Sequence, residues 1–402
     1  MIKANKYYGD LEKSYLFSEI AARVRRHSEA NPEQEILRLG IGDVTLPLAP
    51  AVIAALHEAV DDLASAERFY GYGPEQGYPF LREVIAENDY RARGIDVSAD
   101  EIFISDGAKS DTGNFGDILA GDLTVAIADP VYPVYRDTNI MFGRKDSMIM
   151  LPCTAENGYT PSVPDQPCDL IYLCSPNNPT GAVMSRADLR DWVDYALANQ
   201  SLILFDAAYE SFISDADLVK SIFEIPGAEH CAVEFRSFSK SAGFTGLRCA
   251  YTIIKKITLI NDGNGKMVPL HDLWLRRQTT RFNGASYLSQ RAAAAVYTPE
   301  GKKEATAAIQ YYKRNAEHIR STLSNLGMAV TGGDNSPYVW ARIPEGYTSW
   351  EYFDYLLKNF GIVVTPGSGF GSCGEGYVRF SAFGAWETCR KAMALISKSR
   401  DQ

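Results

Sequence analysis

Long apolar runs are missing from this sequence. No stretch approaches the roughly 18 consecutive apolar residues that a membrane-spanning helix needs. The first eight residues, Met1–Tyr8, also lack the apolar centre of a secretory leader. The sequence therefore predicts a soluble, cytoplasmic protein with no membrane partner.

An excess of positive charge is missing as well. The chain has 40 Lys and Arg residues against 50 Asp and Glu residues, which gives a formal net charge of −10. Proteins that bind nucleic acid or anionic membrane surfaces usually carry the opposite balance. We therefore expect no nucleic-acid partner, and local arginines and lysines must bind any anionic ligand.

Cysteines are few and do not form a pairing pattern. The seven cysteines are scattered and mostly set within apolar runs such as Ile171–Cys174. That pattern suits buried thiols in a reducing compartment better than disulfides or a metal cluster, so we predict no metal site. Internal repeats and low-complexity segments are also absent, which excludes solenoid and disordered classes.

The sequence contains enough apolar residues to form more than one hydrophobic core. Its 402 residues, 46% of them hydrophobic, suit two to three domains. From about residue 100, six nearly continuous apolar runs alternate with helical stretches. Near-continuity is typical of strands covered on both faces, so the runs predict a mostly parallel α/β sheet. They lie at 101–105, 123–128, 169–174, 201–205, 231–235 and 249–254.

Both ends of the chain follow other patterns. Periodicity and breakers predict helices over 14–31, from Pro50, over 301–326 and near 350–359. They also predict strands at 338–343 and 377–381, and a short strand that runs into a glycine turn over 37–43. The C-terminal elements indicate a smaller α+β domain that the N-terminal segment completes. We therefore expect an N-terminal segment over 1–45, a large cofactor-binding domain over 46–295 and a small domain over 296–402.

Polar clusters follow five of the predicted strands. They are Asp106–Lys109, Asp129–Tyr132, Ser175–Gly181, Asp206–Tyr209 and Ser237–Lys240. Open α/β sheets bind ligands beyond the carboxyl ends of their strands. We therefore expect the five clusters to converge at one edge of the sheet and to form a cofactor site.

Lys240 is the centre of this predicted site. It stands between small and hydroxylated residues, and Arg248 follows eight positions later. A lysine in a walled, partly desolvated position can hold an aldehyde as a Schiff base. Ser237, Ser239 and Arg248 supply donors for a phosphate. The pattern predicts an aldehyde cofactor that carries a phosphate, as pyridoxal 5'-phosphate does.

The other clusters suit the remaining parts of that cofactor. Asp206 would pair with a protonated ring nitrogen, and Tyr209 and Asn178 would hydrogen-bond the phenolic oxygen. Tyr132 would stack on the ring, and the helix that opens at Gly107–Lys109 would offer N–H groups to the phosphate. Each residue also has a plainer interpretation as a helix cap, turn residue, core tyrosine or surface ion pair. Their co-occurrence at successive strand ends favours the cofactor site.

These motifs resemble the fold type I pyridoxal-phosphate-dependent aminotransferases of class I and II. The likeness rests on Ser175–Gly181, Asp206–Tyr209 and Ser237–Arg248 and runs essentially from end to end. It implies a seven-stranded, mostly parallel central sheet with helices on both faces, plus the smaller α+β domain. It also implies ping-pong transamination of small amino and keto acids through a Schiff base at Lys240. Arg379 matches the arginine that binds the substrate α-carboxylate.

Further segments resemble family members that act on a diamino dicarboxylic acid. They are Tyr15–Phe17, Ile41–Asp43, Gly71–Gly77, Ser105–Lys109, Phe205–Tyr209, Ser221–Pro226 and Phe282–Ser286. This resemblance implies a homodimer with shared active sites, to which Tyr15, Tyr72, Glu75 and Asn283 are partly donated by the partner subunit. The segment 1–45 would pack with the small domain and with that partner. A carboxylate at Glu75 and a cation or amide at Lys109 and Asn283 would complement the far ammonium and carboxylate of the substrate.

The predicted site is therefore extensive. The catalytic residues would be Lys240, Asp206 and Tyr209. The cofactor-binding residues would be Ala108, Lys109, Tyr132, Asn178, Asp206, Tyr209, Ser237, Ser239, Lys240, Arg248 and Tyr72. The substrate-binding residues would be Tyr15, Gly42, Tyr72, Glu75, Lys109, Tyr132, Asn178, Asn283 and Arg379.

Three alternatives would use the same residues differently. An aminotransferase of the aspartate or aromatic type, or a pyridoxal-phosphate-dependent β-lyase, would need the same cofactor residues. A cofactor-sensing regulator would keep the fold without turnover, but such proteins carry a DNA-binding module in front. Here the first predicted helix begins near residue 14 and the net charge is −10. We therefore expect an enzyme.

Overall fold

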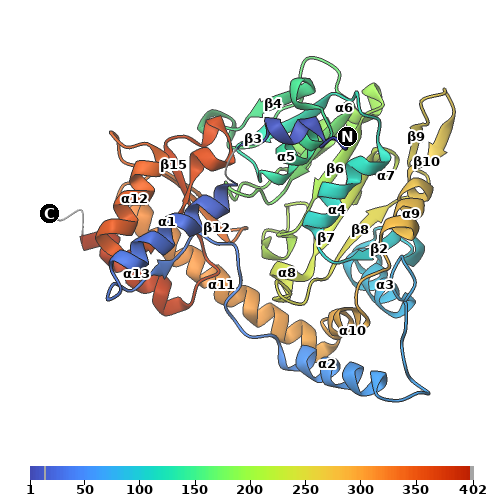
Figure 1. The fold of residues 1–402 in the computed structure, drawn as a ribbon, viewed down its shortest axis with the longest axis horizontal. Coiled ribbons are helices and arrows are strands. Elements are labelled where there is room, and N and C mark those ends of the chain that lie inside the picture. Colours follow the sequence, from blue (N-terminus) through green and yellow to red (C-terminus); the bar gives the residue numbers. More distant parts are fainter. Residues whose placement is uncertain (13–14, 399–402) are drawn as a thin grey trace.

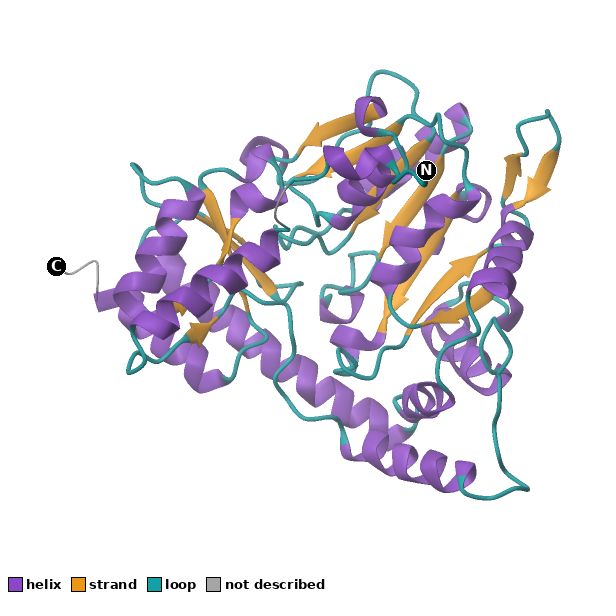
Figure 2. Cartoon of the chain, in the orientation of Figure 1, coloured by secondary structure: helices purple, strands orange, loops and turns teal. Residues whose placement is uncertain are grey.

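The computed structural model describes residues 1–12 and 15–398, and it contains a large sheet and a smaller one (Figure 1). Figure 2 shows both sheets enclosed by helices. Within the described residues, no helix is both long and apolar enough to cross a membrane. All seven cysteines are free thiols, and six of them are buried.

The large sheet has seven strands in the order β2-β8-β7-β6-β5-β3-β4. Only β8 runs antiparallel to its neighbours, so the predicted mostly parallel sheet is confirmed. The strands are β2 (Ile102–Ser105), β3 (Val125–Asp129), β4 (Met148–Pro152), β5 (Leu170–Cys174), β6 (Leu202–Asp206), β7 (Ala232–Ser237) and β8 (Ala250–Ile254). Strand β4 was not predicted. It is an edge strand that is only partly buried, so its sequence is not a continuous apolar run.

Helices cover both faces of this sheet, which is why its strands are apolar on both sides. In β6, Leu202 and Leu204 pack with one cluster while Ile203 and Phe205 pack with the other. The first cluster includes residues of α4 (Ala108–Asn114), α5 (Val134–Met141) and α9 (Leu270–Arg281), and the second includes residues of α6 (Arg186–Asn199) and α7 (Ala228–Cys231). Helices α2 (Pro50–Leu63), α3 (Pro79–Ile85) and α10 (Tyr287–Ala295) pack near β2 and β8.

The smaller sheet is antiparallel and has the order β11-β12-β15-β14. Its strands are β11 (Val330–Gly332), β12 (Tyr338–Arg342), β14 (Thr365–Pro366) and β15 (Tyr377–Ser381). Helices α11 (Pro299–Asn325), α12 (Ser349–Phe360) and α13 (Trp386–Lys398) pack around it and share one apolar core. We call this assembly the small lobe. The predicted helix 301–326 begins two residues earlier than expected, because Thr298 caps it and Pro299 fits its first turn.

The N-terminal segment contacts both parts of the molecule. In α1 (Leu16–Ala30), the buried residues Leu16, Ile20 and Val24 enter the core of the small lobe, and β1 (Leu37–Arg38) pairs with β13 (Ile362–Val363). Ser14, the predicted first residue of this helix, lies outside the described residues. The short helix η1 (Lys6–Asp10) lies instead beside α5 of the large sheet (Figure 1), where Asn5 donates to the Met141 carbonyl at 3.1 Å.

Short elements complete the chain. The hairpin of β9 (Leu259–Asn261) and β10 (Met267–Pro269) projects from the molecule (Figure 1). The remaining helices are η2 (Ala86–Tyr90), η3 (Arg91–Arg93), η4 (Ala99–Glu101), η5 (Phe115–Ile118), η6 (Lys145–Ser147), η7 (Ala155–Asn157), η8 (Glu210–Phe212), η9 (Ile222–Glu224), α8 (Phe238–Ser241), η10 (Gly367–Phe370) and η11 (Ser372–Gly374). Of these, η8 and α8 follow β6 and β7 and carry polar residues to the carboxyl edge of the large sheet.

Candidate active site

A cavity of about 400 Å³ lies at the carboxyl ends of the parallel strands, between the large sheet and the small lobe. It collects residues from segments that are far apart in the sequence, as expected for the edge of an α/β sheet. The predicted site residues that line it are Gly42, Ala108, Lys109, Tyr132, Asn178, Asp206, Tyr209, Ser237, Ser239, Lys240, Arg248 and Arg379.

Lys240 stands in the middle of these residues. Ser237 caps helix α8 by accepting a hydrogen bond from the Ser239 backbone N–H at 3.1 Å, which fixes the turn that carries the lysine. Lys240 Nζ donates to the Gly42 carbonyl oxygen. Burial lowers the pKa of Lys240 to about 8, against the opposing effect of the Asp43 carboxylate. A substantial fraction of the amine is therefore neutral near physiological pH, the state in which it is a nucleophile or a base.

Asp206 ends strand β6 inside the cavity. Its Oδ2 accepts a hydrogen bond from the Tyr135 hydroxyl at 2.6 Å, and its Oδ1 accepts one from the Ala208 backbone N–H at 3.1 Å. Burial raises the pKa of Asp206, while these two donors lower it by stabilising the ionised form. The carboxylate is thus held in one orientation and lacks a cationic partner among the contacts of the described residues.

A chain of polar side chains crosses the cavity from the large sheet to the small lobe. Asn178 Nδ2 donates to the Tyr209 hydroxyl at 3.5 Å, and the hydroxyl oxygens of Tyr209 and Tyr338 lie 2.9 Å apart. Arg379 is only 1% exposed and donates to Asn178 Oδ1 and, at 2.6 Å, to the Gly40 carbonyl. Within the described residues its Nε has no partner. A buried guanidinium that lines a cavity and has a donor without a partner is suited to bind an anionic ligand.

Arg248 lies at one end of the cavity with two serines. A Cβ on Gly107 would lie 2.2 Å from Arg248 Nη2, so only glycine permits this close approach. Arg248 Nη1 also donates to Ser239 Oγ at 3.3 Å, and Ser237 lines the same cavity. A guanidinium, two hydroxyl groups and the first turn of α4, which starts at Ala108, form a suitable set of donors for a phosphate.

Lys109, Tyr15 and Tyr132 lie together at the side of the cavity. Lys109 Nζ donates to the Tyr15 hydroxyl at 3.4 Å and lies 5.1 Å and 5.9 Å from the centroids of the Tyr15 and Tyr132 rings. Burial raises the pKa of Tyr132, so this phenol stays neutral. The predicted residue Tyr15 therefore reaches the rim of the site within its own chain.

Tyr72, Glu75 and Asn283 are not brought to the cavity within one chain. Tyr72 is 92% exposed, and Asn283 is also exposed. Gly284 packs against the Pro74 carbonyl, so the segments that carry Glu75 and Asn283 lie side by side on the surface. A single subunit thus leaves three of the predicted site residues together, outside its own site.

Several residues of the cavity were not predicted. They are Phe17, Ile41, Asp43, Tyr135, Cys174, Ala208, Thr245 and Tyr338. Tyr135 could have been found, because it follows the predicted residue Tyr132 by only three positions, and its backbone N–H donates to the Tyr132 carbonyl at 3.4 Å. Tyr338 gave no such signal, since it belongs to a strand of the small lobe that only tertiary structure brings to the large sheet.

The fold and this site define a member of the aminotransferases. Residues 34–396 match the family model described as aminotransferase class I and II, and the chain belongs to that family. The resemblance inferred from the motifs is therefore confirmed. A solved mutant of the aspartate aminotransferase of Thermus thermophilus has the same fold, with a TM-score of 0.85 at 20% identity over 99% of this chain and all of that one.

Relatives with higher sequence identity indicate which group of aminotransferases this chain is most similar to. The LL-diaminopimelate aminotransferase of Desulfotalea psychrophila is 54% identical over 99% of this chain and 100% of its own length. That of Bacteroides fragilis is 52% identical over 98% of this chain and 99% of its own. The solved L,L-diaminopimelate aminotransferase of Chlamydomonas reinhardtii is 42% identical with a TM-score of 0.93, covering 99% of this chain and 98% of that one. These relatives agree with the predicted group that acts on a diamino dicarboxylic acid.

Proposed function

We propose that this chain interconverts LL-2,6-diaminopimelate plus 2-oxoglutarate and tetrahydrodipicolinate plus glutamate, as a step of lysine biosynthesis. The observation that carries the proposal is the Lys240 amine, with its pKa lowered to about 8, in one cavity with Asp206, Arg379 and the donors around Arg248. The full-length similarity to proteins named LL-diaminopimelate aminotransferase supports the choice of substrate.

The residues of the cavity fit pyridoxal 5'-phosphate. Arg248, Ser237 and Ser239 would hold the phosphate beside the Gly107 backbone, and Asp206 would hold the ring nitrogen. Tyr209 and Asn178 would hold the phenolic oxygen, and Tyr132 would cover the ring. When bound, this cofactor supplies the electron-withdrawing ring that stabilises negative charge at the substrate α-carbon.

The chain's own residues would then bind the substrate and move the proton. Arg379 would bind the α-carboxylate through its forked donors, since its buried guanidinium already has its orientation fixed by Asn178 and Gly40. Lys240 Nζ would take the proton from the substrate α-carbon, because a base with a pKa near the working pH transfers protons efficiently. Tyr135 keeps the Asp206 carboxylate in place during this step.

The pH dependence of cofactor uptake tests the environment of Lys240. An ordinary lysine has a pKa of 10.5, and burial lowers this one to about 8. Only the neutral amine attacks an aldehyde, so the rate at which cofactor-free protein takes up pyridoxal 5'-phosphate should rise with pH through a midpoint near 8. Stopped-flow absorbance measures this rate, with N-acetyl-lysine amide as the control for titration of the cofactor itself. A protein midpoint equal to that of the control would contradict the assignment.

We further propose a homodimer in which each site is completed by the partner subunit. The 92% exposure of Tyr72 and the adjacent positions of Glu75 and Asn283 support this arrangement, because none of the three lines the cavity of its own chain. Phe69 and Tyr70, next to Tyr72 in the sequence, are exposed as well, and a group of exposed apolar side chains is typical of a protein–protein interface. The partner subunit's Tyr72 would reach the phosphate, and the partner subunit's Glu75 would reach the far end of the substrate.

Replacing Glu75 with alanine should impair diaminopimelate far more than glutamate. The far ammonium of diaminopimelate would lose its carboxylate partner, and we expect kcat/KM for this substrate to fall about 10- to 100-fold while that for glutamate changes little. Steady-state assays with each amino donor measure both values. Glu83→Ala is the matched control, since Glu83 pairs with Arg91 on the outer surface of α3. Equal losses for the two donors would remove Glu75 from substrate selection.

A spectrum and a product assay test the proposed function directly. The purified protein should show the absorbance of a lysine-bound pyridoxal cofactor, and LL-diaminopimelate should change that spectrum. Added 2-oxoglutarate should then yield glutamate. If another amino acid gives glutamate and diaminopimelate does not, the substrate is wrong. If diaminopimelate is broken down without glutamate release, the reaction is not a transamination.

A further inference from the structure

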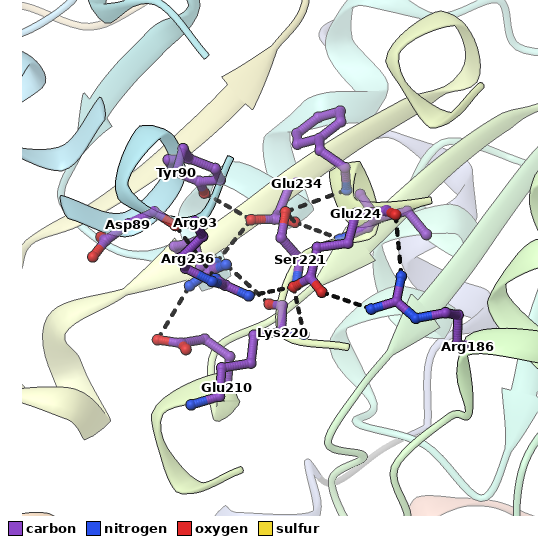
Figure 3. A network of polar contacts seen from close by, with 12 residues as sticks. Asp89, Tyr90, Arg93, Arg186, Glu210, Lys220, Ser221, Glu224, Glu234 and Arg236 are labelled. Atoms are coloured by element: carbon purple, nitrogen blue, oxygen red, sulfur yellow. Dashed lines mark hydrogen bonds and ion pairs between the residues drawn. The ribbon is translucent and has the colours of Figure 1, made fainter. Parts of the chain in front are cut away.

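A network of ion pairs and hydrogen bonds centres on Arg236 (Figure 3), the residue that immediately precedes Ser237 of the active site. Arg236, whose side chain is 3% exposed, pairs through Nε with the fully buried Glu234 at 2.8 Å and through Nη1 with Glu210 at 3.1 Å. Its Nη2 donates to the Lys220 carbonyl at 2.9 Å. Glu234 also accepts hydrogen bonds from Tyr90 and other donors, so the inner part of the network is well satisfied.

The pair Glu210–Arg236 joins two catalytic segments. Glu210 immediately follows Tyr209 at the start of η8, and Arg236 immediately precedes Ser237, which caps the helix of Lys240. Strands β6 and β7 pair as far as Asp206 and Phe235, and the Ala207 N–H still donates to the Phe235 carbonyl at 2.9 Å. Among the described residues, no further backbone hydrogen bond joins these two segments. The ion pair is therefore the next link between them on the way to Tyr209 and Lys240.

The short helix that carries Lys240 is not closely packed on the side where Ser237, Phe238 and Ser241 line a second cavity. This cavity has a volume of about 300 Å³, and Glu210 and Arg236 are among its other lining residues. A wall that faces open space loses the contacts that hold a close-packed core residue in place. Burial raises the pKa of Glu210, and the Arg236 charge opposes that rise by favouring the ionised carboxylate.

We propose that Glu210 and Arg236 are positioning residues of the active site, whose ion pair holds the Tyr209 segment at a fixed distance from the turn of Lys240. This inference rests on the proposed function, because it concerns the same site. Neither residue lines the catalytic cavity, so both act through their chain neighbours. Loss of the link would let Tyr209 move away from the phenolic oxygen of the cofactor and Lys240 from the substrate α-carbon.

The test compares variants on the inner and outer sides of the network in the cofactor-bound enzyme. Glu210→Ala leaves Arg236 paired with Glu234, so the buried cation keeps a partner. We expect kcat to fall about 10- to 100-fold with little change in KM, as for a small misplacement of reacting groups. We also expect the pH midpoint of the cofactor absorbance to rise by about one unit, because one hydrogen bond to the phenolic oxygen weakens. Arg236→Lys should change kcat and the pH midpoint in the same way, because a lysine cannot reach both Glu210 and Glu234.

Two further variants separate positioning from general stability. Glu210→Gln keeps an oxygen that accepts from Arg236 and should recover most of kcat. Arg186→Ala removes a half-exposed partner of Glu224 at the outer side of the same network and should match wild type in kcat and midpoint. The inference would be overturned if Glu210→Ala and Arg236→Lys kept the wild-type kcat and pH midpoint, or if Arg186→Ala lost as much kcat as they do. Either result would leave the proposed function unaffected. A wild-type protein without cofactor absorbance would overturn both.

Discussion

Replacement of Lys240 with alanine should reduce transamination by about 10³-fold or more and abolish the absorbance of the lysine-bound cofactor. In the proposed mechanism, the substitution would remove both the amine that binds the cofactor aldehyde and the base that moves the substrate proton. Other lysines cannot substitute, because within the described residues only Lys109 joins Lys240 at the cavity, and Lys109 faces the rings of Tyr15 and Tyr132.

The fold should tolerate this change. Burial already disfavours the Lys240 cation, and its only hydrogen bond among those identified goes to the Gly42 carbonyl. Thermal unfolding and circular dichroism should therefore match wild type. Lys256→Ala is a suitable control, because Lys256 is paired with Asp100 on the surface, away from the cavity. Turnover in the Lys240→Ala protein above a few per cent of wild type would show that the reaction does not pass through this lysine.

The sequence predicted most of the large sheet because burial on both faces demands apolar residues at every position. Strands such as β5 and β6 are buried throughout and were found as runs. Strand β4 and the hairpin of β9 and β10 were missed for the opposite reason. Their residues are partly exposed, and no periodic pattern separates them from loops.

The sequence could predict that the proposed cofactor residues share one cavity, because they follow strands directly. Asp206 and Lys240 each lie within three residues of a strand end, so the topology of a parallel sheet is enough to bring them together. Tyr135 and Arg236 depend on packing instead. Tyr135 reaches Asp206 from a neighbouring helix, and its only sequence signal is its spacing from Tyr132. Arg236 faces away from the cavity and has no sequence signal of its own.

The substrate residues were the hardest to place. Tyr72, Glu75 and Asn283 were named from a family resemblance, and within one chain they lie on the surface. In the proposed homodimer their position relative to the cavity would depend on the partner subunit, and neither strand order nor hydrophobic pattern predicts how two subunits pack. Specificity therefore awaits the Glu75 assay, whereas the cofactor site can be argued from the geometry of a single chain.

Replacement of Asp206 with asparagine should give the second large loss, about 10² to 10³-fold in kcat. The proposed role of this carboxylate is to keep the ring nitrogen protonated, and a neutral amide cannot stabilise that positive charge. The effect should fall mainly on kcat, because Arg379 and the residues around Arg248 still bind the substrate and the phosphate. Steady-state kinetics with saturating cofactor measures the change.

The change should leave the local structure intact, which makes the test specific for charge. An asparagine carbonyl at the Oδ1 position can still accept from the Ala208 N–H, and its amide can donate to the Tyr135 hydroxyl, which then acts as the acceptor. Asp169→Asn is the matched control, since Asp169 precedes β5 at the opposite end of the sheet and bonds Thr124. Wild-type kcat in the Asp206→Asn enzyme would exclude an ionic role for Asp206. A loss of the same size in Asp169→Asn would instead indicate a general effect on the sheet.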